Sequence, residues 1–169
     1  MKTFIFEIME QKRVIYDFRT GLAKAEAYCA YQERSQQEVR DKLYSWGLHS
    51  REVEQIISTL IENNFLNEAR FAAAYVSGKF RIKKWGKLKI KHGLKLKRIP
   101  DRMIARALNA IDGDAYIETI VSLAEKKIPF LGTTDAFKRK FKLITYLQGR
   151  GFENDVILDA LKNSGLLEK

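Results

Sequence analysis

The stretch RSQQEVRDKLYSWGLHSREVEQIISTL, residues 34–60, determines the fold of this chain. Ser35 and Glu38 form the S-x-x-E capping box that begins an α-helix, and Gly47 is the residue type that most often ends one. Ser50 then has a side chain suited to cap a second helix. Apolar residues follow both caps at helical spacing, namely Val39, Leu43 and Trp46, then Val53, Ile56, Ile57 and Leu60. The stretch therefore predicts a helix, a tight turn and a second helix.

The same pattern recurs twice further along the chain. Adding 51 to the core positions gives Ile90, Leu94, Ile104, Ala107, Leu108 and Ile111, and adding 104 gives Leu143, Leu147, Ile157, Ala160 and Leu161. Ser164, the third counterpart of Leu60, is polar, and the counterparts of Trp46 are the basic residues Lys97 and Arg150. The turns match as well, with the apolar residues Leu48, Ile99 and Phe152 and the predicted caps Ser50, Asp101 and Asn154. Self-similarity of this kind indicates a tandem helical repeat.

Each copy is preceded by a further apolar segment: LAKAEAYCAY, NEARFAAAYV and DAYIETIVSLAEKK. Each unit is therefore predicted to hold three helices. We predict an all-α chain with a short N-terminal extension at residues 1–20, repeat 1 at 21–66, repeat 2, the basic one, at 67–112, and repeat 3 at 113–169. Because stacked repeats bury apolar faces that no single unit can bury, we expect an elongated, curved array of nine helices.

The first 20 residues lie outside the repeat. Apolar residues alternate on both sides of the polar MEQKR, at Phe4, Phe6 and Ile8 and again at Val14, Tyr16 and Phe18. This alternation favours a small β-hairpin, with a short helix as the alternative. The segment lacks the apolar run and cleavage site of a secretory signal, so we predict that it belongs to the mature chain.

The positive charge is concentrated in one window. Residues 79–98, KFRIKKWGKLKIKHGLKLKR, hold ten of the 31 basic residues and no carboxylate, whereas the other 21 are matched by the 21 acidic residues. Such a local excess predicts contact with an acidic or polyanionic partner. We predict that the partner or DNA is bound by Lys79, Arg81, Lys83, Lys84, Trp85, Lys87, Lys89, Lys91, Lys95, Lys97 and Arg98.

Basic and apolar residues alternate from Lys87 to Lys91 and again from Leu94 to Lys97, which on its own would favour a β-strand. They are the counterpart of the first helix in residues 34–60, however, so we predict a helix. A projection of that helix places Trp85, Leu88, His92 and Leu96 on the side away from the core. Two interpretations stay open: the stripe packs between neighbouring repeats, or it binds a partner.

Other functional classes find little support. The single Cys29 sits in an apolar segment and is predicted to belong to the core, and the absence of a possible disulfide suits a reducing, cytoplasmic setting. His49 and His92 have no metal-ligand spacing, and WGKLKIKHG lacks the ending of a phosphate-binding loop. No stretch has the length of a membrane span. We predict a monomer that is not an enzyme and has no metal or cofactor.

The three units together resemble the RecX family of bacterial regulatory proteins, which modulate the recombinase RecA. The resemblance covers roughly residues 22–165 and rests on RSQQEVRDKLYSWG, FLNEARFAAAYV, WGKLKIKHGLKLKRIPDRMIARAL and LITYLQGRGFENDVILDAL. Two residues depart from the family pattern. Asn67 replaces the usual Asp but can still cap a helix, whereas Arg98 replaces the turn glycine of repeat 2 and predicts a different turn geometry there.

The resemblance implies a non-enzymatic protein that lies in the groove of the RecA–DNA filament and inhibits or modulates the recombinase in DNA repair and the SOS response. RecA and single- or double-stranded DNA are then the expected partners. Two alternatives remain from the residues alone. The chain could be an autonomous nucleic-acid-binding helical repeat protein, or a generic helical adaptor.

Overall fold

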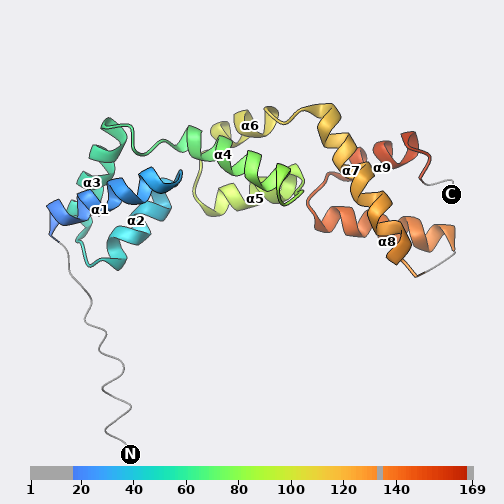
Figure 1. The fold of residues 1–169 in the computed structure, drawn as a ribbon, viewed down its shortest axis with the longest axis horizontal. Coiled ribbons are helices and arrows are strands. Elements are labelled where there is room, and N and C mark those ends of the chain that lie inside the picture. Colours follow the sequence, from blue (N-terminus) through green and yellow to red (C-terminus); the bar gives the residue numbers. More distant parts are fainter. Residues whose placement is uncertain (1–16, 133–134, 167–169) are drawn as a thin grey trace, which may run out of the picture. The chain divides into compact units, whose positions relative to one another are not determined.

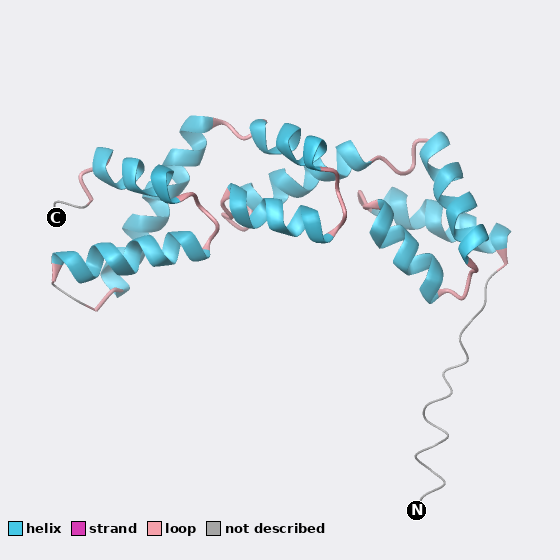
Figure 2. Ribbon diagram, turned by 180° about the vertical axis from the view of Figure 1, so that it is seen from behind, coloured by secondary structure: helices cyan, strands magenta, loops and turns pink. Residues whose placement is uncertain are grey.

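A computed structural model describes residues 17–132 and 135–166. Within these ranges the secondary structure consists of helices joined by turns, with no strand (Figure 2). The elements are α1 (Phe18–Tyr31), α2 (Gln36–Ser45), α3 (Ser50–Glu62), α4 (Glu68–Arg81), α5 (Lys87–Leu96), α6 (Asp101–Asn109), α7 (Gly113–Lys127), the 3₁₀ turn η1 (Ile128–Phe130), α8 (Ala136–Gly149) and α9 (Asn154–Asn163) (Figure 1). The predicted all-α fold is confirmed, including a helix at residues 87–96 in spite of the local alternation.

The described chain divides into an N-terminal body up to Phe71 and a C-terminal body from Ala72 onward. In the N-terminal body α1, α2 and α3 pack around one apolar core. The core contains Ala25, Cys29, Val39, Leu43, Leu48, Val53, Ile56, Ile57, Leu60 and Leu66. The positions that the repeat pattern assigned to the interior of repeat 1 are therefore buried, except for Trp46, which is partly buried and packs against this core. Cys29 belongs to the core as predicted.

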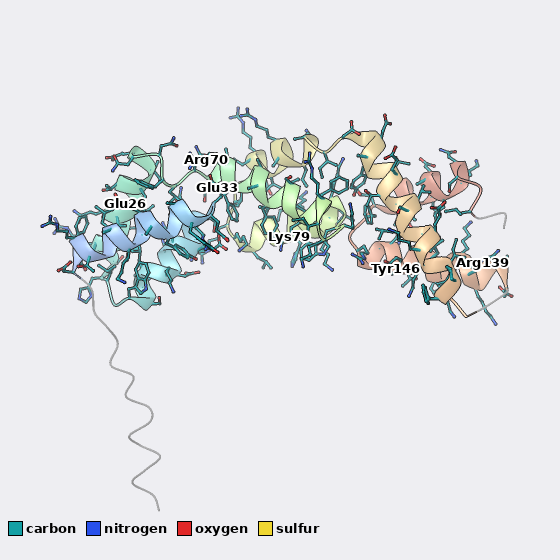
Figure 3. The ribbon with its side chains drawn as sticks, in the orientation of Figure 1. Glu26, Glu33, Arg70, Lys79, Arg139 and Tyr146 are labelled. Atoms are coloured by element: carbon teal, nitrogen blue, oxygen red, sulfur yellow. The ribbon has the colours of Figure 1, made fainter. Side chains whose placement is uncertain are left out.

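Local hydrogen bonds hold the helix ends of this body. The Ser35 hydroxyl accepts from the Glu38 amide at 3.2 Å, and the Glu38 carboxylate accepts from the Ser35 amide at 3.0 Å, which completes the predicted capping box. Arg70 forms an ion pair with Glu33 at 2.8 Å, and its guanidinium also donates to the Asn64 carbonyl at 3.0 Å (Figure 3). Asn67 accepts from the Arg70 amide at 2.9 Å, so it caps α4 as expected.

The C-terminal body holds most of α4 together with α5–α9. Its interior repeats the predicted pattern, with Ile90, Leu94, Ile104, Leu143, Leu147, Ile157 and Leu161 all buried. The predicted core residue Ile111 is only partly buried. Aromatic rings connect α4 to the core formed by α7, α8 and α9. The Tyr116 ring lies 5.7 Å from the Phe80 ring and 5.2 Å from the Phe152 ring, centre to centre. Such tilted ring pairs stabilise a core beyond simple apolar burial.

The turn between the second and third helix has the same left-handed backbone conformation in all three repeats. Gly47 and Gly151 have φ values of 85° and 91°, and Arg98 has a φ of 58°. In each turn the amide of the residue after this position donates to a leucine carbonyl of the preceding helix. Ile99 donates to Leu94 at 3.2 Å, for example, and Phe152 donates to Leu147 at 3.3 Å. The prediction of a different turn at Arg98 is therefore wrong. The hydrogen bonds and the buried isoleucine force a non-glycine residue into the left-handed region.

Two further predictions at helix starts need correction. Ser50, Asp101 and Asn154 are the first residues of their helices rather than the caps. The preceding residues have extended backbones, and their carbonyls accept the first helical hydrogen bond, as from Val53 to His49 at 2.9 Å. Phe18, assigned to the second strand of a hairpin, begins α1, where the Asp17 side chain caps the helix. The rest of that predicted hairpin, with its alternative short helix, lies outside the described residues.

Candidate partner-binding surface

The predicted binding residues occupy the end of α4, the following turn, α5 and the turn before α6. None of them is buried. Arg81, Lys83, Lys84, Lys89, Lys91, Lys95 and Arg98 are exposed, and Lys79, Trp85, Lys87 and Lys97 are partly buried. Although they form one continuous run in the sequence, the fold distributes them over several environments.

One group forms a ladder of alternating cations and aromatic rings between α4 and α5. The Lys79 ammonium lies 5.1 Å from the centre of the Tyr75 ring and 4.9 Å from that of Trp85 (Figure 3). Lys89 approaches the Trp85 ring at 4.8 Å, and Lys97 approaches the Tyr75 ring at 5.9 Å. These separations are in the range of cation–π attraction. We call Tyr75, Lys79, Trp85, Lys89 and Lys97 the cation–aromatic ladder.

A small residue makes this arrangement possible. A Cβ atom at position 93 would collide with the hydroxyl of Tyr75, so Gly93 lets the tyrosine lie across α5. Trp85 precedes Gly86, the N-cap of α5, and therefore stands outside the helix on which the sequence projection placed it. The ammonium groups of Lys79 and Lys89 both approach its ring. Tyr75 was not among the predicted residues, although it stands one helical turn before Lys79 in the sequence.

The other predicted cations have different neighbours. Lys95 forms an ion pair with Asp101 at 3.3 Å, and Lys87 lies 4.9 Å from the centre of the Tyr116 ring. Arg98 stands in the turn before α6. Arg81 and Lys84 line a groove of about 610 Å³ between α4, the end of α6 and α7. Its walls are mainly apolar or small, with Val76, Phe80, Ala107, Ala110, Ile111 and Leu123 among the lining residues.

Three residues of the predicted apolar stripe lie within α5, and all three are exposed. Leu88 is 54% and Leu96 is 71% exposed, and His92 is exposed as well. Within the C-terminal body, repeat 3 therefore does not cover Leu88 and Leu96, because side chains in a packed interface would be shielded from solvent. The stripe stays a candidate for partner binding.

Repeats 2 and 3 are joined at the start of α5. The Gly86 amide donates to the Arg150 carbonyl at 2.9 Å, the Leu88 amide donates to the Gly151 carbonyl at 3.0 Å, and Arg150 donates back to the Lys83 carbonyl at 2.8 Å. These bonds fix the ladder relative to the last three helices. Sequence reasoning gave no sign of them, because they connect segments more than 60 residues apart.

A buried hydroxyl strengthens the same junction. The Tyr116 hydroxyl accepts from the Lys87 amide at 2.8 Å and donates to the Glu153 carboxylate at 2.6 Å. Burial raises the pKa of Tyr116, and the hydrogen bond to Glu153 raises it further. The hydroxyl therefore keeps its proton and serves as a structural donor.

Neither a metal-binding cluster nor a reactive cysteine occurs in the described ranges. No cluster of three or more His, Cys, Asp or Glu side chains in residues 17–132 and 135–166 could hold a metal ion. Burial raises the pKa of the Cys29 thiol to about 11, which keeps the sulfur protonated and poorly nucleophilic near neutral pH. Among the described helices none is both long and apolar enough to cross a bilayer.

The fold defines a class of proteins built from consecutive three-helix domains. Family models for the first, second and third three-helix domains of RecX match residues 22–60, 67–108 and 114–161. The chain belongs to the RecX family of regulatory proteins.

Individual relatives agree with this assignment. The regulatory protein RecX of Prosthecochloris aestuarii is 33% identical over 145 residues, which cover 86% of this chain and 93% of the relative. The RecX protein of Clostridium acetobutylicum is 31% identical over 163 residues, 94% of this chain and 73% of the relative. The crystal structure of RecX from Lactobacillus salivarius superposes with a TM-score of 0.81 at 29% identity, covering 88% of this chain and 97% of that one.

Proposed function

We propose that this chain binds the RecA–DNA filament and modulates recombinase activity, as a non-enzymatic regulator in DNA repair and the SOS response in the cytoplasm. Membership of the RecX family supports a regulatory role. The observation that carries the proposal is the cation–aromatic ladder, which presents three lysines around two aromatic rings in a segment without any carboxylate between Ala69 and Pro100.

The ladder suits a filament groove lined by acidic protein side chains and phosphates. Its ammonium groups keep part of their hydration while they lie against the rings, so each can still form an ion pair with an incoming carboxylate or phosphate. Trp85 adds a flat apolar surface at the centre, and a partly buried tryptophan flanked by polar groups is typical of residues that dominate binding energy. The exposed Leu88 and Leu96 of α5 add further apolar area.

This arrangement leads to a proposed mode of binding. The protein acts as a monomer whose repeat 2 supplies the main contact, while repeats 1 and 3 extend the footprint along the filament. Recognition requires no metal or cofactor. The contact residues are those predicted from the sequence, with Tyr75 added because it completes the ladder.

Co-sedimentation with preformed RecA filaments on single-stranded DNA tests the proposal. The chain should pellet with the filament and reduce DNA-dependent ATP hydrolysis, and Trp85→Ala should weaken both effects without loss of helix content. A control sample with the same DNA but no recombinase measures binding to DNA alone. Equal pelleting with and without recombinase would contradict the proposal and favour autonomous nucleic-acid binding, for which affinity should fall steeply with salt.

A further inference from the structure

Repeat 3 contains a second basic segment that the overall charge balance conceals. Residues 136–152 hold Lys138, Arg139, Lys140, Lys142 and Arg150 and no Asp or Glu. Most of these cations belong to the run FKRKFK, residues 137–142, at the start of α8. The run places two phenylalanines four residues apart, with three cations between them.

The phenylalanines of this region face solvent. Phe137 is 79% and Phe141 is 66% exposed, and residues four apart lie on the same side of a helix. Phe130, in η1, is 78% exposed. The Lys142 ammonium donates to the Leu131 carbonyl at 2.9 Å, which holds the end of that turn beside α8.

These rings contribute little to the core. The buried side of α8 is supplied by Leu143 and Leu147, which are at most 1% exposed. Phe141 is the counterpart of the exposed Leu88 in repeat 2 and of the polar Gln37 in repeat 1. Two repeats of the C-terminal body therefore carry an exposed apolar side chain at the same position, although folding requires none there.

We propose that Phe130, Phe137 and Phe141 form a stacking surface for the unpaired bases of single-stranded nucleic acid, with Lys138 and Lys140 placed to contact its phosphates. Aromatic rings interleaved with cations are the recurring feature of sequence-independent single-strand binding. The binding needs no recombinase, so this inference goes beyond the proposed function and can fail independently of it.

Two other partners fit these residues less well. Protein interfaces are depleted of lysine at their centres, whereas here cations fill every position between the two α8 rings. A helix that lies in a membrane surface buries a continuous apolar face in lipid, but the continuous apolar face of α8 packs in the protein interior. Single-stranded nucleic acid uses both the rings and the charges.

The test compares two strands with the complete chain, by fluorescence anisotropy. One is a dye-labelled oligothymidylate, and the other is an abasic deoxyribose–phosphate strand of the same length. The unmodified protein should bind the strand with bases more tightly. The double variant Phe137→Ala/Phe141→Ala should bind oligothymidylate at least about fivefold more weakly and bind the abasic strand unchanged.

Tyr31→Ala is the matched control, because Tyr31 is an aromatic residue with 83% exposure on α1. It should behave as the unmodified protein does. Phe141→Leu keeps apolar area but loses the aromatic ring, so its affinity should fall for oligothymidylate and stay unchanged for the abasic strand. This variant serves as the test if the double variant does not fold. Equal affinity of the unmodified protein for both strands, or an unchanged preference in the variants, would overturn the proposal. So would phenylalanine-dependent binding to phosphatidylglycerol vesicles without any base preference.

Discussion

Gly86 and Gly151 meet backbone to backbone at the junction of repeats 2 and 3. A Cβ atom on Gly86 would collide with the Gly151 carbonyl, and one on Gly151 would collide with Lys89. The close approach lets the Gly86 amide reach the Arg150 carbonyl at 2.9 Å. The position of α5, and with it that of the ladder, thus depends on the absence of two side chains.

Gly86→Ala should lower the free energy of unfolding by about 1 to 3 kcal/mol, the usual cost of inserting a methyl group where packing leaves no room. Gly78→Ala is the control, because nothing lies within 4 Å of a Cβ at that helical position. It should stabilise the protein by about 0.5 to 1 kcal/mol. Urea denaturation of both variants measures the difference, and equal stability of the two would refute the close contact.

Arg98→Gly should stabilise the protein by about 1 kcal/mol, because Arg98 has a φ of 58° that a glycine adopts without strain. Gly47→Ala, at the equivalent turn of repeat 1, should be destabilising for the same reason. Both effects appear as a shifted denaturation midpoint at constant slope. A loss of stability in Arg98→Gly would mean that the arginine side chain contributes more than its backbone strain costs.

Leu43→Ala and Leu147→Ala should each reduce the free energy of unfolding by about 2 to 5 kcal/mol, because both leucines are fully buried. They are equivalent positions in repeats 1 and 3, in separate bodies of the chain. Their effects should therefore add in the double variant. Thermal and chemical denaturation measure them, and an unchanged stability at either site would contradict the repeat register.

Tyr116→Phe should be destabilising by about 1 to 3 kcal/mol at neutral pH, because it leaves the partly buried Lys87 amide and Glu153 carboxylate without this hydrogen-bond partner. The pKa of Tyr116 is raised in the folded state, so its contribution is complete below the unfolded value of about 10 and declines as the pH rises above it. The stability difference between the two proteins should then shrink from pH 10 upward. A constant difference over that range would argue against a buried, protonated phenol.

The sequence predicted the parts of this fold that depend on repetition. Val39, Ile90 and Leu143 begin the same pattern in three places, and that agreement outweighs the alternating run at 87–97, because burial of Ile90 and Leu94 stabilises the helix more than strand propensity opposes it. The turn at Arg98 was mispredicted because neighbouring packing, rather than residue type, sets its backbone.

The sequence indicates which segment carries the charge of the site, but not how its side chains are arranged in space. Composition indicates the lysines, yet the ladder depends on Gly93 leaving room for Tyr75, and the junction depends on Gly86 meeting Gly151 across the fold. Such contacts leave no periodic signal. The FKRKFK run did carry a visible signal, because it is basic, has no acidic residue and contains two phenylalanines. It was missed because the net charge of the chain outside residues 79–98 is zero.

The contribution of the ladder to filament binding is the central claim, and charge reversal at Lys79 and Lys89 tests it. Arg19→Glu/Arg51→Glu is the matched control, since it changes the net charge equally at two exposed arginines of the N-terminal body. Both double variants should keep their helix content, because exposed or partly exposed cations contribute little to stability.

The decisive measurement is the fraction of protein that co-sediments with RecA filaments at near-physiological salt, where long-range attraction is screened beyond about 8 Å. The account predicts that the unmodified protein and the Arg19→Glu/Arg51→Glu control pellet with the filament, while Lys79→Glu/Lys89→Glu stays in the supernatant. Undiminished pelleting of Lys79→Glu/Lys89→Glu, or equal losses in both variants, would contradict it.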